Sequence, residues 1–424
     1  MKKILALALA MAMSLSLAAC GGGDKGGSSA AGPGSDGSSS AAPGGDSSGS
    51  SSSIKVGAIY ITSQNDVAGY TYQHHNGITS AMEALGLDPA DLIVVDNVPD
   101  NDDTAVANAI DTVVNQGADI VFGISFGYIN AMADKAEQYP DVIFSHGTGY
   151  MANDTNFNNY FGRIYQARYL AGIAAGMESK LSKNDSIGNV AAYNTDYAET
   201  CSGINAFALG AQSVNPDAVV YVNVIDTWGN ETLERQAAMA LFDVYQCCVI
   251  SQHCDSAQPQ QVAQEYGMKG CGYNSDMTEQ APNAHLTAAI WHWNVYYQTA
   301  IQAAMDCNGD ASKFVENMGG NAYYAGLKEG FVDISPLNEN WDGYSDTKAI
   351  MDAVRELIVS GEWDVFSGVK LSYEITDGKV EIVKTNAPLM DAQGNEIVPA
   401  GGPSVDDSVI KGSMDYNVAG VIEG

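Results

Sequence analysis

The sequence predicts an α/β fold with two parallel sheets, each covered by helices. Short apolar runs alternate with segments of helical spacing along residues 54–290, and this alternation is typical of parallel sheets. The runs are nearly continuous, as expected of strands that are buried on both faces. They form two successive series of similar size, and the body 54–424 is too long for one typical core. We therefore expect two sheets.

The first series starts at the apolar strand IKVGAIY (54–60). The turn-forming stretch PDNDD (99–103) supplies an N-cap for a helix over 104–116, and Gly117 ends that helix. The predicted strands are 54–60, 91–98, 119–125 and 141–147, and the predicted helices are 70–85, 104–116 and 129–138.

The second series has predicted helices at 165–180, 200–213, 231–245 and 259–266, and predicted strands at 187–194, 218–226, 247–252, 269–274 and 285–290. Its stretch DVYQCCVISQHCDS (243–256) is rich in cysteine, histidine and aspartate, as a metal or redox site would be. In this series, however, the stretch is a helix end, a strand and a strand-end loop. Cys248 and Cys254 then lie roughly 20 Å apart and cannot share one metal. No glycine ends the helix, so Gln246 or a cysteine must make the turn.

Residues 369–424 form a C-terminal extension after the two series. The alternation in SYEITDGKVEIV (372–383) predicts a hairpin that turns around 377–378. We expect the extension to be a surface addition, and the sequence assigns it no role.

The N-terminus predicts secretion and lipidation. Lys2 and Lys3 precede an apolar run over 4–19 that is too short for a comfortable membrane span and fits a secretory signal. Leu17-Ala18-Ala19-Cys20 has the pattern of a bacterial lipobox, so residues 1–20 form a lipoprotein signal and Cys20 receives the lipid. An ordinary signal with a chance cysteine is the alternative.

Residues 21–53 contain 23 glycines or serines among 33 residues. Such a chain cannot bury enough apolar surface to offset its ordering entropy, so it forms a tether with ends roughly 30 Å apart. The mature protein is therefore expected on the extracytoplasmic face of the cell membrane, anchored by its lipid.

Charge and cysteine content narrow the possible partners. The formal net charge of −32 argues against nucleic acid, which requires a basic surface. Six cysteines remain beyond Cys20, and an even number outside the cytoplasm permits disulfides: Cys201, Cys247, Cys248, Cys254, Cys271 and Cys307.

The candidate ligand-binding residues follow the predicted strands, because open parallel sheets bind ligands beyond the carboxyl ends of their strands. Aromatic rings and carboxylates recur there, which suits a flat heteroaromatic ligand. The candidates are Asp66, Tyr70, Ser125, Phe126, Gly127 and His146 in the first series, and Trp228, His253, Asp255, Asn274, Asp276 and Trp291 in the second. Structural alternatives stay open: Asp255 and Asp276 also suit helix N-caps, and His146 and His253 also suit buried structural imidazoles.

Several stretches, in the same order along residues 54–363, resemble the basic membrane protein family of ABC-transporter substrate-binding lipoproteins, which includes purine nucleoside receptors. Among them are GYTYQHHNG (69–77), DVIFSHGTGY (141–150), FGRIYQARYLAG (161–172), GINAFALGAQSVNP (203–216) and HLTAAIWHWNVYY (285–297).

The resemblance implies a type I periplasmic-binding-protein fold, in which two Rossmann-like lobes joined by a hinge close over the ligand. On this basis the N-terminal lobe is 54–163 plus about 290–325, and the C-terminal lobe is 164–289 plus about 326–424. An ABC permease and its ATPase subunit are the implied partners. No cofactor or metal is expected.

The resemblance also implies a purine ligand held between two rings. Tyr70 matches the first ring, Trp228 is the candidate for the second, and Asp255 and Asp276 occupy segments that bind polar edges. Nucleoside binders of the family carry a lysine shortly after the Leu-Thr of 285–290, whereas Trp291 lies near that place here. The departure favours a free base such as adenine, hypoxanthine or xanthine over a nucleoside.

Three other functions remain as alternatives. The same fold also binds sugars and other small ring compounds. A nucleoside hydrolase would need a dense aspartate cluster, and DNDD (100–103) is the candidate run, although it also suits a helix cap. An adhesin or sensor without a transport role is the third. No zinc-protease H-E-x-x-H motif or phosphate-binding G-x-x-x-x-G-K-[ST] loop is present.

Overall fold

The computed structural model describes residues 54–376 and 378–424. The predicted signal, Cys20 and the predicted tether lie outside the described residues. In the described part of the chain, no helix combines the length and the apolar character that a bilayer crossing requires.

The first sheet has six strands, and all neighbouring pairs are parallel. In order across the sheet they are β11 (Ala322–Ala325), β5 (Phe157–Gly162), β4 (Ile143–Gly147), β3 (Ile120–Gly123), β1 (Val56–Ile59) and β2 (Leu92–Val95). Its helices are α1 (Gly69–Ala84), α2 (Asp103–Asn115), α3 (Ile129–Gln138), α8 (Trp293–Asp306) and α9 (Phe314–Asn317).

The second sheet has seven strands, all in parallel pairs except β12, which lies antiparallel to β10. In order they are β12 (Val332–Ile334), β10 (His285–Trp291), β9 (Lys269–Asn274), β8 (Val249–His253), β6 (Ser186–Ala191), β7 (Val219–Val224) and β17 (Val421–Glu423). Its helices are α4 (Ile164–Ser182), α5 (Ala198–Val214), α6 (Glu231–Asp243), α7 (Gln258–Glu265) and α10 (Tyr344–Ser360).

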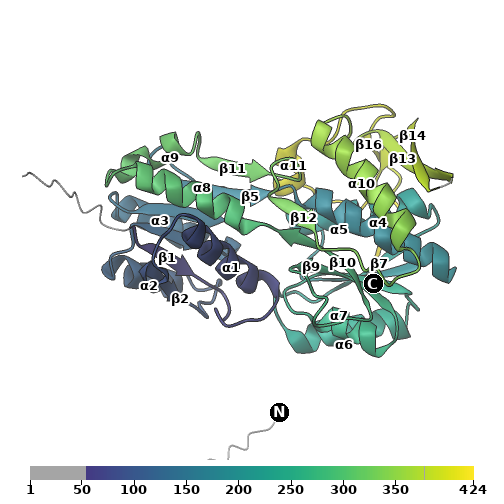
Figure 1. Ribbon diagram of the computed structural model, residues 1–424, viewed down its shortest axis with the longest axis horizontal. Coiled ribbons are helices and arrows are strands. Elements are labelled where there is room, and N and C mark those ends of the chain that lie inside the picture. The colour runs from purple at the N-terminus through teal and green to yellow at the C-terminus, as the bar shows by residue number, and fades with distance from the viewer. Residues whose placement is uncertain (1–53, 377) are drawn as a thin grey trace, which may run out of the picture. The chain divides into compact units, whose positions relative to one another are not determined.

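Helices cover both faces of each sheet (Figure 1). On the first sheet α1 and α8 pack together on one face, and α2 and α3 pack on the other. On the second sheet α4 and α5 cover one face and α6 and α7 the other. The α/β prediction with two parallel sheets is therefore confirmed.

The chain passes between the two sheets three times. It leaves the first sheet after β5, returns after β10, and leaves again after β11. β5 escaped prediction because its sequence FNNYFG contains two asparagines. Asn158 is nevertheless buried, since its side-chain amide donates to the Tyr296 hydroxyl at 2.9 Å.

The 243–256 stretch has the predicted helix–strand–loop structure. Gln246 makes the turn between α6 and β8 with a left-handed backbone (φ 55°). All six described cysteines are buried free thiols, so the disulfides that the even count permits do not form among them.

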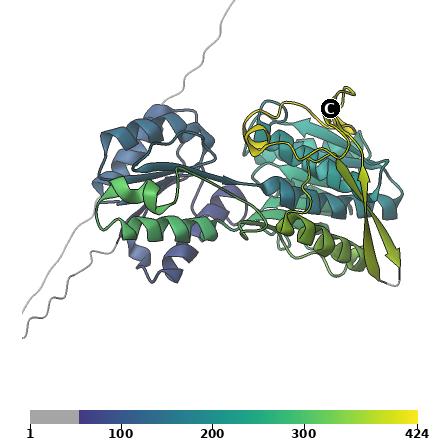
Figure 2. The same ribbon diagram turned by 90° about the horizontal axis from the view of Figure 1, so that it is seen from above.

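The C-terminal extension folds back over the second sheet (Figure 2). The predicted hairpin is present as the antiparallel pair β13 (Val369–Thr376) and β14 (Lys379–Asn386). It is followed by β15 (Leu389–Met390), β16 (Glu396–Val398) and the short helix α11 (Asp407–Gly412), which packs on α5. The chain then ends in β17, which pairs with β7. The expectation of a mere surface addition is therefore wrong, because the extension completes the edge of the second sheet.

Candidate functional site

A cavity of about 660 Å³ is lined by residues from both sheets and from the C-terminal extension. This volume is typical of small-molecule sites. Residues after β1, β3 and β4 line one side, and residues after β6, β7 and β8 line the other. Side chains at the carboxyl ends of parallel strands therefore converge, as the strand-end argument predicts.

Nine aromatic side chains line this cavity: Tyr70, Phe126, Tyr150, Phe161, Tyr197, Trp228, Tyr273, Tyr323 and Tyr324. Phe126, which follows β3 of the first sheet, lies edge-on to Tyr197 at the start of α5, with 5.8 Å between ring centroids. Tyr197 is also edge-on to Trp228 at 5.6 Å. Rings from the two sheets thus meet across the cavity.

Asp255 is placed by the loop after β8. Its backbone N–H donates to the Trp228 carbonyl at 2.9 Å, and the Asn274 side-chain amide donates to its carboxyl at 3.4 Å. Burial, and then the negative charge of Glu234, raise the pKa of Asp255 well above its usual value. The carboxyl therefore keeps its proton to a higher pH than an exposed aspartate does, and in that form it both donates and accepts hydrogen bonds.

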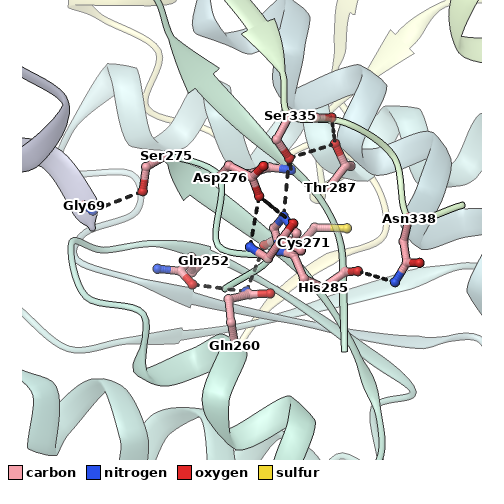
Figure 3. Close-up of polar contacts among 12 residues, drawn as sticks. Gly69, Gln252, Gln260, Cys271, Ser275, Asp276, His285, Thr287, Ser335 and Asn338 are labelled. Carbon is pink, nitrogen blue, oxygen red and sulfur yellow. Dashed lines mark hydrogen bonds and ion pairs between the residues drawn. The ribbon is translucent and has the colours of Figure 1, made fainter. Parts of the chain in front are cut away.

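Gly69 allows the start of α1 to approach this loop. A Cβ on Gly69 would lie 2.1 Å from the Asp255 carbonyl oxygen, and the residue has a φ of +88°. Its N–H donates to the Ser275 hydroxyl at 3.1 Å (Figure 3). Glycine is therefore required where the first sheet's leading helix meets the loops of the second sheet.

The buried side chains of Arg168 and His253 support Glu199 in the cavity wall. Burial raises the Glu199 pKa, but the charges of His253 and Arg168 outweigh burial and hold it below its usual value. His253 Nε2 lies 3.1 Å from Glu199 Oε1, but the two atoms are not aligned for a hydrogen bond. The Arg168 guanidinium stacks 3.6 Å from the Tyr273 ring centroid. Glu199 is therefore an ionised acceptor beside the protonatable Asp255.

Ser125 lies in GISFG (123–127), which has the Gly-x-Ser-x-Gly spacing of hydrolase nucleophiles. Its hydroxyl donates to the Asp100 carboxylate at 2.9 Å. His146 Nε2 contacts the backbone carbonyl of Ser125 at 2.7 Å and not its hydroxyl. The serine therefore has no histidine base positioned on its hydroxyl.

The structure brings five of the twelve predicted residues to the cavity, and the other seven do not line it. The five are Tyr70, Ser125, Phe126, Trp228 and Asp255, and the seven are Asp66, Gly127, His146, His253, Asn274, Asp276 and Trp291. His253 and Asn274 lie directly behind Glu199 and Asp255, whose carboxyls they contact.

The remaining five have structural contacts. Asp66 accepts from the Thr62 hydroxyl at 2.7 Å, and His146 contacts the Ser125 carbonyl. A Cβ on Gly127 would lie 2.0 Å from the Asp100 carbonyl oxygen. Asp276 accepts from the Thr278 N–H at 2.9 Å and lies 3.6 Å from His285 (Figure 3). Trp291 is buried and stacks on Trp293 at 4.4 Å.

Sequence reasoning missed several residues of the cavity wall. Tyr197 and Glu199 follow β6, so the strand-end rule could have found them. Ser408, Lys411 and Gly412 belong to α11 in the C-terminal extension, and no pattern in the sequence linked that segment to the cavity.

Three comparisons identify relatives of the chain. A family model described as "ABC transporter substrate-binding protein PnrA-like" matches residues 54–366. The chain is 34% identical over 368 residues to a purine-binding protein of Brucella abortus, covering 87% of this chain and 93% of that protein. It is 36% identical over 253 residues to a putative ABC transporter glucose-binding protein of Haloferax volcanii, covering 59% of each.

Solved structures share the fold at low identity. A solute-binding protein of an ABC transporter system from Conexibacter woesei matches with a TM-score of 0.57 and 19% identity, over 73% of this chain and 98% of that one. A solute-binding protein from Aeropyrum pernix matches with a TM-score of 0.59 and 16% identity, over 76% and 94%. The type I periplasmic-binding-protein fold is thereby confirmed. The chain belongs to the PnrA-like (Bmp) family of ABC-transporter substrate-binding proteins, which are binding proteins and not enzymes.

Proposed function

We propose that the protein captures a purine, preferentially as the free base, in this cavity and delivers it to an ABC permease and its ATPase subunit. The lobes are taken as 54–163 with about 290–325, and 164–289 with about 326–424. They close on the ligand by a hinge. The lipid on Cys20 and the 21–53 tether keep the protein near the permease at high effective concentration.

The observation that carries the proposal is the pairing of a ring-lined cavity with two unlike carboxyls. Purines offer flat faces for stacking and an edge that alternates N–H donors with nitrogen acceptors. A protonated Asp255 both donates and accepts, and an ionised Glu199 accepts. Together they match such an edge. The purine-binding relative from Brucella abortus supports the same ligand class.

The preference for a base over a nucleoside rests on β10. Trp291 stands where nucleoside binders of the family carry a lysine, and it is buried against Trp293. β10 therefore provides no lysine at this position that could bind a ribose.

Calorimetry with the purified protein tests this proposal. Adenine, hypoxanthine, xanthine, adenosine and inosine are titrated after mass spectrometry has identified whatever ligand co-purifies. Tighter binding of a base than of its nucleoside is the expected result. Tight binding of nucleosides with no binding of bases would contradict the base preference, and no binding of any purine would contradict the proposal as a whole.

A sugar is the second candidate ligand. Stacking rings beside carboxylates also suit sugar hydroxyls, and the Haloferax volcanii relative is named as a putative glucose-binding protein. Glucose therefore belongs in the same titration, and binding of glucose without purines would favour this second candidate.

A further inference from the structure

Lys411 brings a positive charge to an otherwise acidic cavity. It is the one lysine or arginine among the cavity-lining residues of the described chain, whose acidic members are Asp196, Glu199 and Asp255. Its ammonium lies over the ring of Tyr324, another lining residue, at 4.7 Å from the centroid. None of the ion pairs within residues 54–376 and 378–424 includes Lys411, so no carboxylate lies within 4.0 Å of its ammonium.

The short helix α11 fixes the backbone position of Lys411, whose side chain is exposed. Asp406 caps this helix by accepting from the Ser408 N–H at 2.8 Å, and Ile410 is 1% exposed in the core. The Arg163 guanidinium donates to both carboxylate oxygens of Asp407: Nε lies 3.2 Å from Oδ1 and 3.1 Å from Oδ2, and Nη2 lies 2.5 Å from Oδ2. This bidentate geometry fixes the orientation of the helix as well as its position.

The anchors of α11 are segments through which the chain passes between the two sheets. Arg163 lies between β5 and α4, at the first passage, and also donates to the Tyr324 carbonyl at 3.1 Å. Tyr324 lies in β11, just before the third passage. The position of Lys411 is therefore tied to the boundary of the cavity and not only to the second sheet.

This arrangement gives the cavity a fixed polarity. Carboxyls stand on the side of β6 and β8, and an ammonium without a carboxylate partner stands on the side of β11 and α11. A bound ring compound with N–H donors at one edge and an oxygen acceptor elsewhere would satisfy both sides at once. A charged donor to such an oxygen contributes more than a neutral one.

We propose that Lys411 is a specificity-determining residue whose ammonium binds an oxygen acceptor of the ligand. The proposal rests on the proposed function and deepens it. In a free base the acceptor is the carbonyl oxygen of an oxopurine, so hypoxanthine binds more tightly than adenine. In a nucleoside a ribose hydroxyl is the other source of the same acceptor chemistry.

Four ligands separate the possible sources of the oxygen: adenine has none, hypoxanthine has a carbonyl, adenosine has a ribose, and inosine has both. Each is titrated calorimetrically into the wild-type protein, Lys411→Met and Lys411→Arg. Lys370→Met is the matched control, because Lys370 is exposed on β13 and does not line the cavity. Lys411→Met is expected to lower the affinity for hypoxanthine by about tenfold or more and that for adenine by less than about twofold. Lys411→Arg keeps a charged donor and is expected to lose less affinity for hypoxanthine than Lys411→Met does. Lys370→Met is expected to leave the affinity for all four ligands unchanged.

Asp407→Asn is a second variant that tests the anchoring. It weakens the Arg163 pair, leaves Lys411 intact, and is expected to reproduce the ligand pattern of Lys411→Met at smaller size. Unchanged melting temperatures show that these variants remain folded.

An affinity for hypoxanthine and inosine within twofold of the wild type in Lys411→Met would overturn the proposal. An equal loss for all four ligands would overturn it too, because adenine offers no oxygen. A loss confined to adenosine and inosine keeps Lys411 as the oxygen-binding residue and contradicts the base carbonyl as its partner. If the wild type binds no purine, the proposed function fails, and the compound found by mass spectrometry is titrated in place of the purines. A lower affinity for that compound in Lys411→Met then supports the role of Lys411, and an unchanged affinity overturns it.

Discussion

Asp255 and Glu199 show how two carboxyls in one cavity acquire different protonation. Glu199 has the Arg168 guanidinium and the imidazole of His253 as neighbours, which hold its pKa down against burial, whereas Asp255 is desolvated beside the negative charge of Glu234. The first is therefore ionised more readily than usual and the second less readily. In the proposed complex this difference decides which carboxyl donates a hydrogen bond to the base.

The affinity for a free base should fall as the pH rises through the raised pKa of Asp255. Below that pKa the carboxyl carries the proton that it donates, and above it the donor is lost. Asp255→Asn keeps a donor and an acceptor without titrating, so its affinity should depend less on pH. Calorimetry over a series of pH values above the ordinary aspartate pKa of about 4 checks this, and an affinity that rises with pH in the wild type would contradict it.

Trp228 is predicted to stack on the ligand. Stacking of a base on an aromatic side chain is worth about 1–3 kcal/mol, so Trp228→Ala should weaken binding roughly ten- to a hundredfold. Tyr266→Ala is the control, because Tyr266 stacks on Phe242 away from the cavity. An unchanged affinity in Trp228→Ala would remove this ring from the site.

Among the elements, α2 begins where the sequence predicts a helix cap. Asp102, in the DNDD run, accepts from the N–H groups of Thr104 and Ala105 at 3.0 and 3.1 Å. The DNDD run is therefore a helix cap, which was the structural alternative for it. The nucleoside hydrolase alternative thereby loses its candidate aspartate cluster.

Asp102→Ala should lower the free energy of unfolding by about 1 kcal/mol, because it leaves backbone donors at the helix start without their acceptor. Asp103→Ala removes the same charge one residue later without removing the cap, so it should cost less. Urea unfolding measures both. Equal losses would contradict the capping role, and ligand affinity should stay unchanged in either variant.

The sequence predicted the elements that local chemistry determines. The alternation of apolar runs and helices predicted α3 and β9 with the bounds that the structure has. The absence of a glycine indicated a turn at Gln246 or a cysteine, and Gln246 makes it. α11 could not be predicted in the same way. Six residues make a marginal helix, and its place depends on the Arg163–Asp407 contact between residues 244 positions apart.

The candidate site was predictable in part for the same reason. The strand-end rule found Trp228 and Asp255 because their positions follow from the topology of a parallel sheet. It could not tell that Asp276 would turn toward Thr278 and His285, or that Trp291 would stack on Trp293. Those choices depend on tertiary neighbours.

At the scale of the whole molecule, buried histidines make the protein sensitive to acid. Burial lowers the pKa of His74, His75, His146, His253 and His285. For His146 burial lowers the pKa to about 4, although the contact with the Ser125 carbonyl acts in the opposite direction. Between the histidine pKa of the unfolded chain and that of the folded chain, the unfolded chain binds more protons. The free energy of unfolding therefore decreases as the pH falls through this range.

The histidines therefore lower the free energy of unfolding at pH 5 relative to pH 7, whereas Asp255, whose pKa burial raises, acts in the opposite direction. With an unfolded pKa of about 6.5 and a folded pKa of about 4, His146 alone accounts for about 2 kcal/mol of this change. His146→Gln should reduce the difference between the two pH values by a similar amount, as measured by urea unfolding. A difference that is the same in the variant and the wild type would contradict the assignment.

We propose that a purine base occupies the cavity between the two sheets, and a crystal structure of the protein with hypoxanthine is the sharpest test. Density for the base is expected inside the cavity, with a face against Trp228 and an edge within hydrogen-bond distance of Asp255. Density for the base outside the cavity, or inside it without contact to either residue, would refute this binding site.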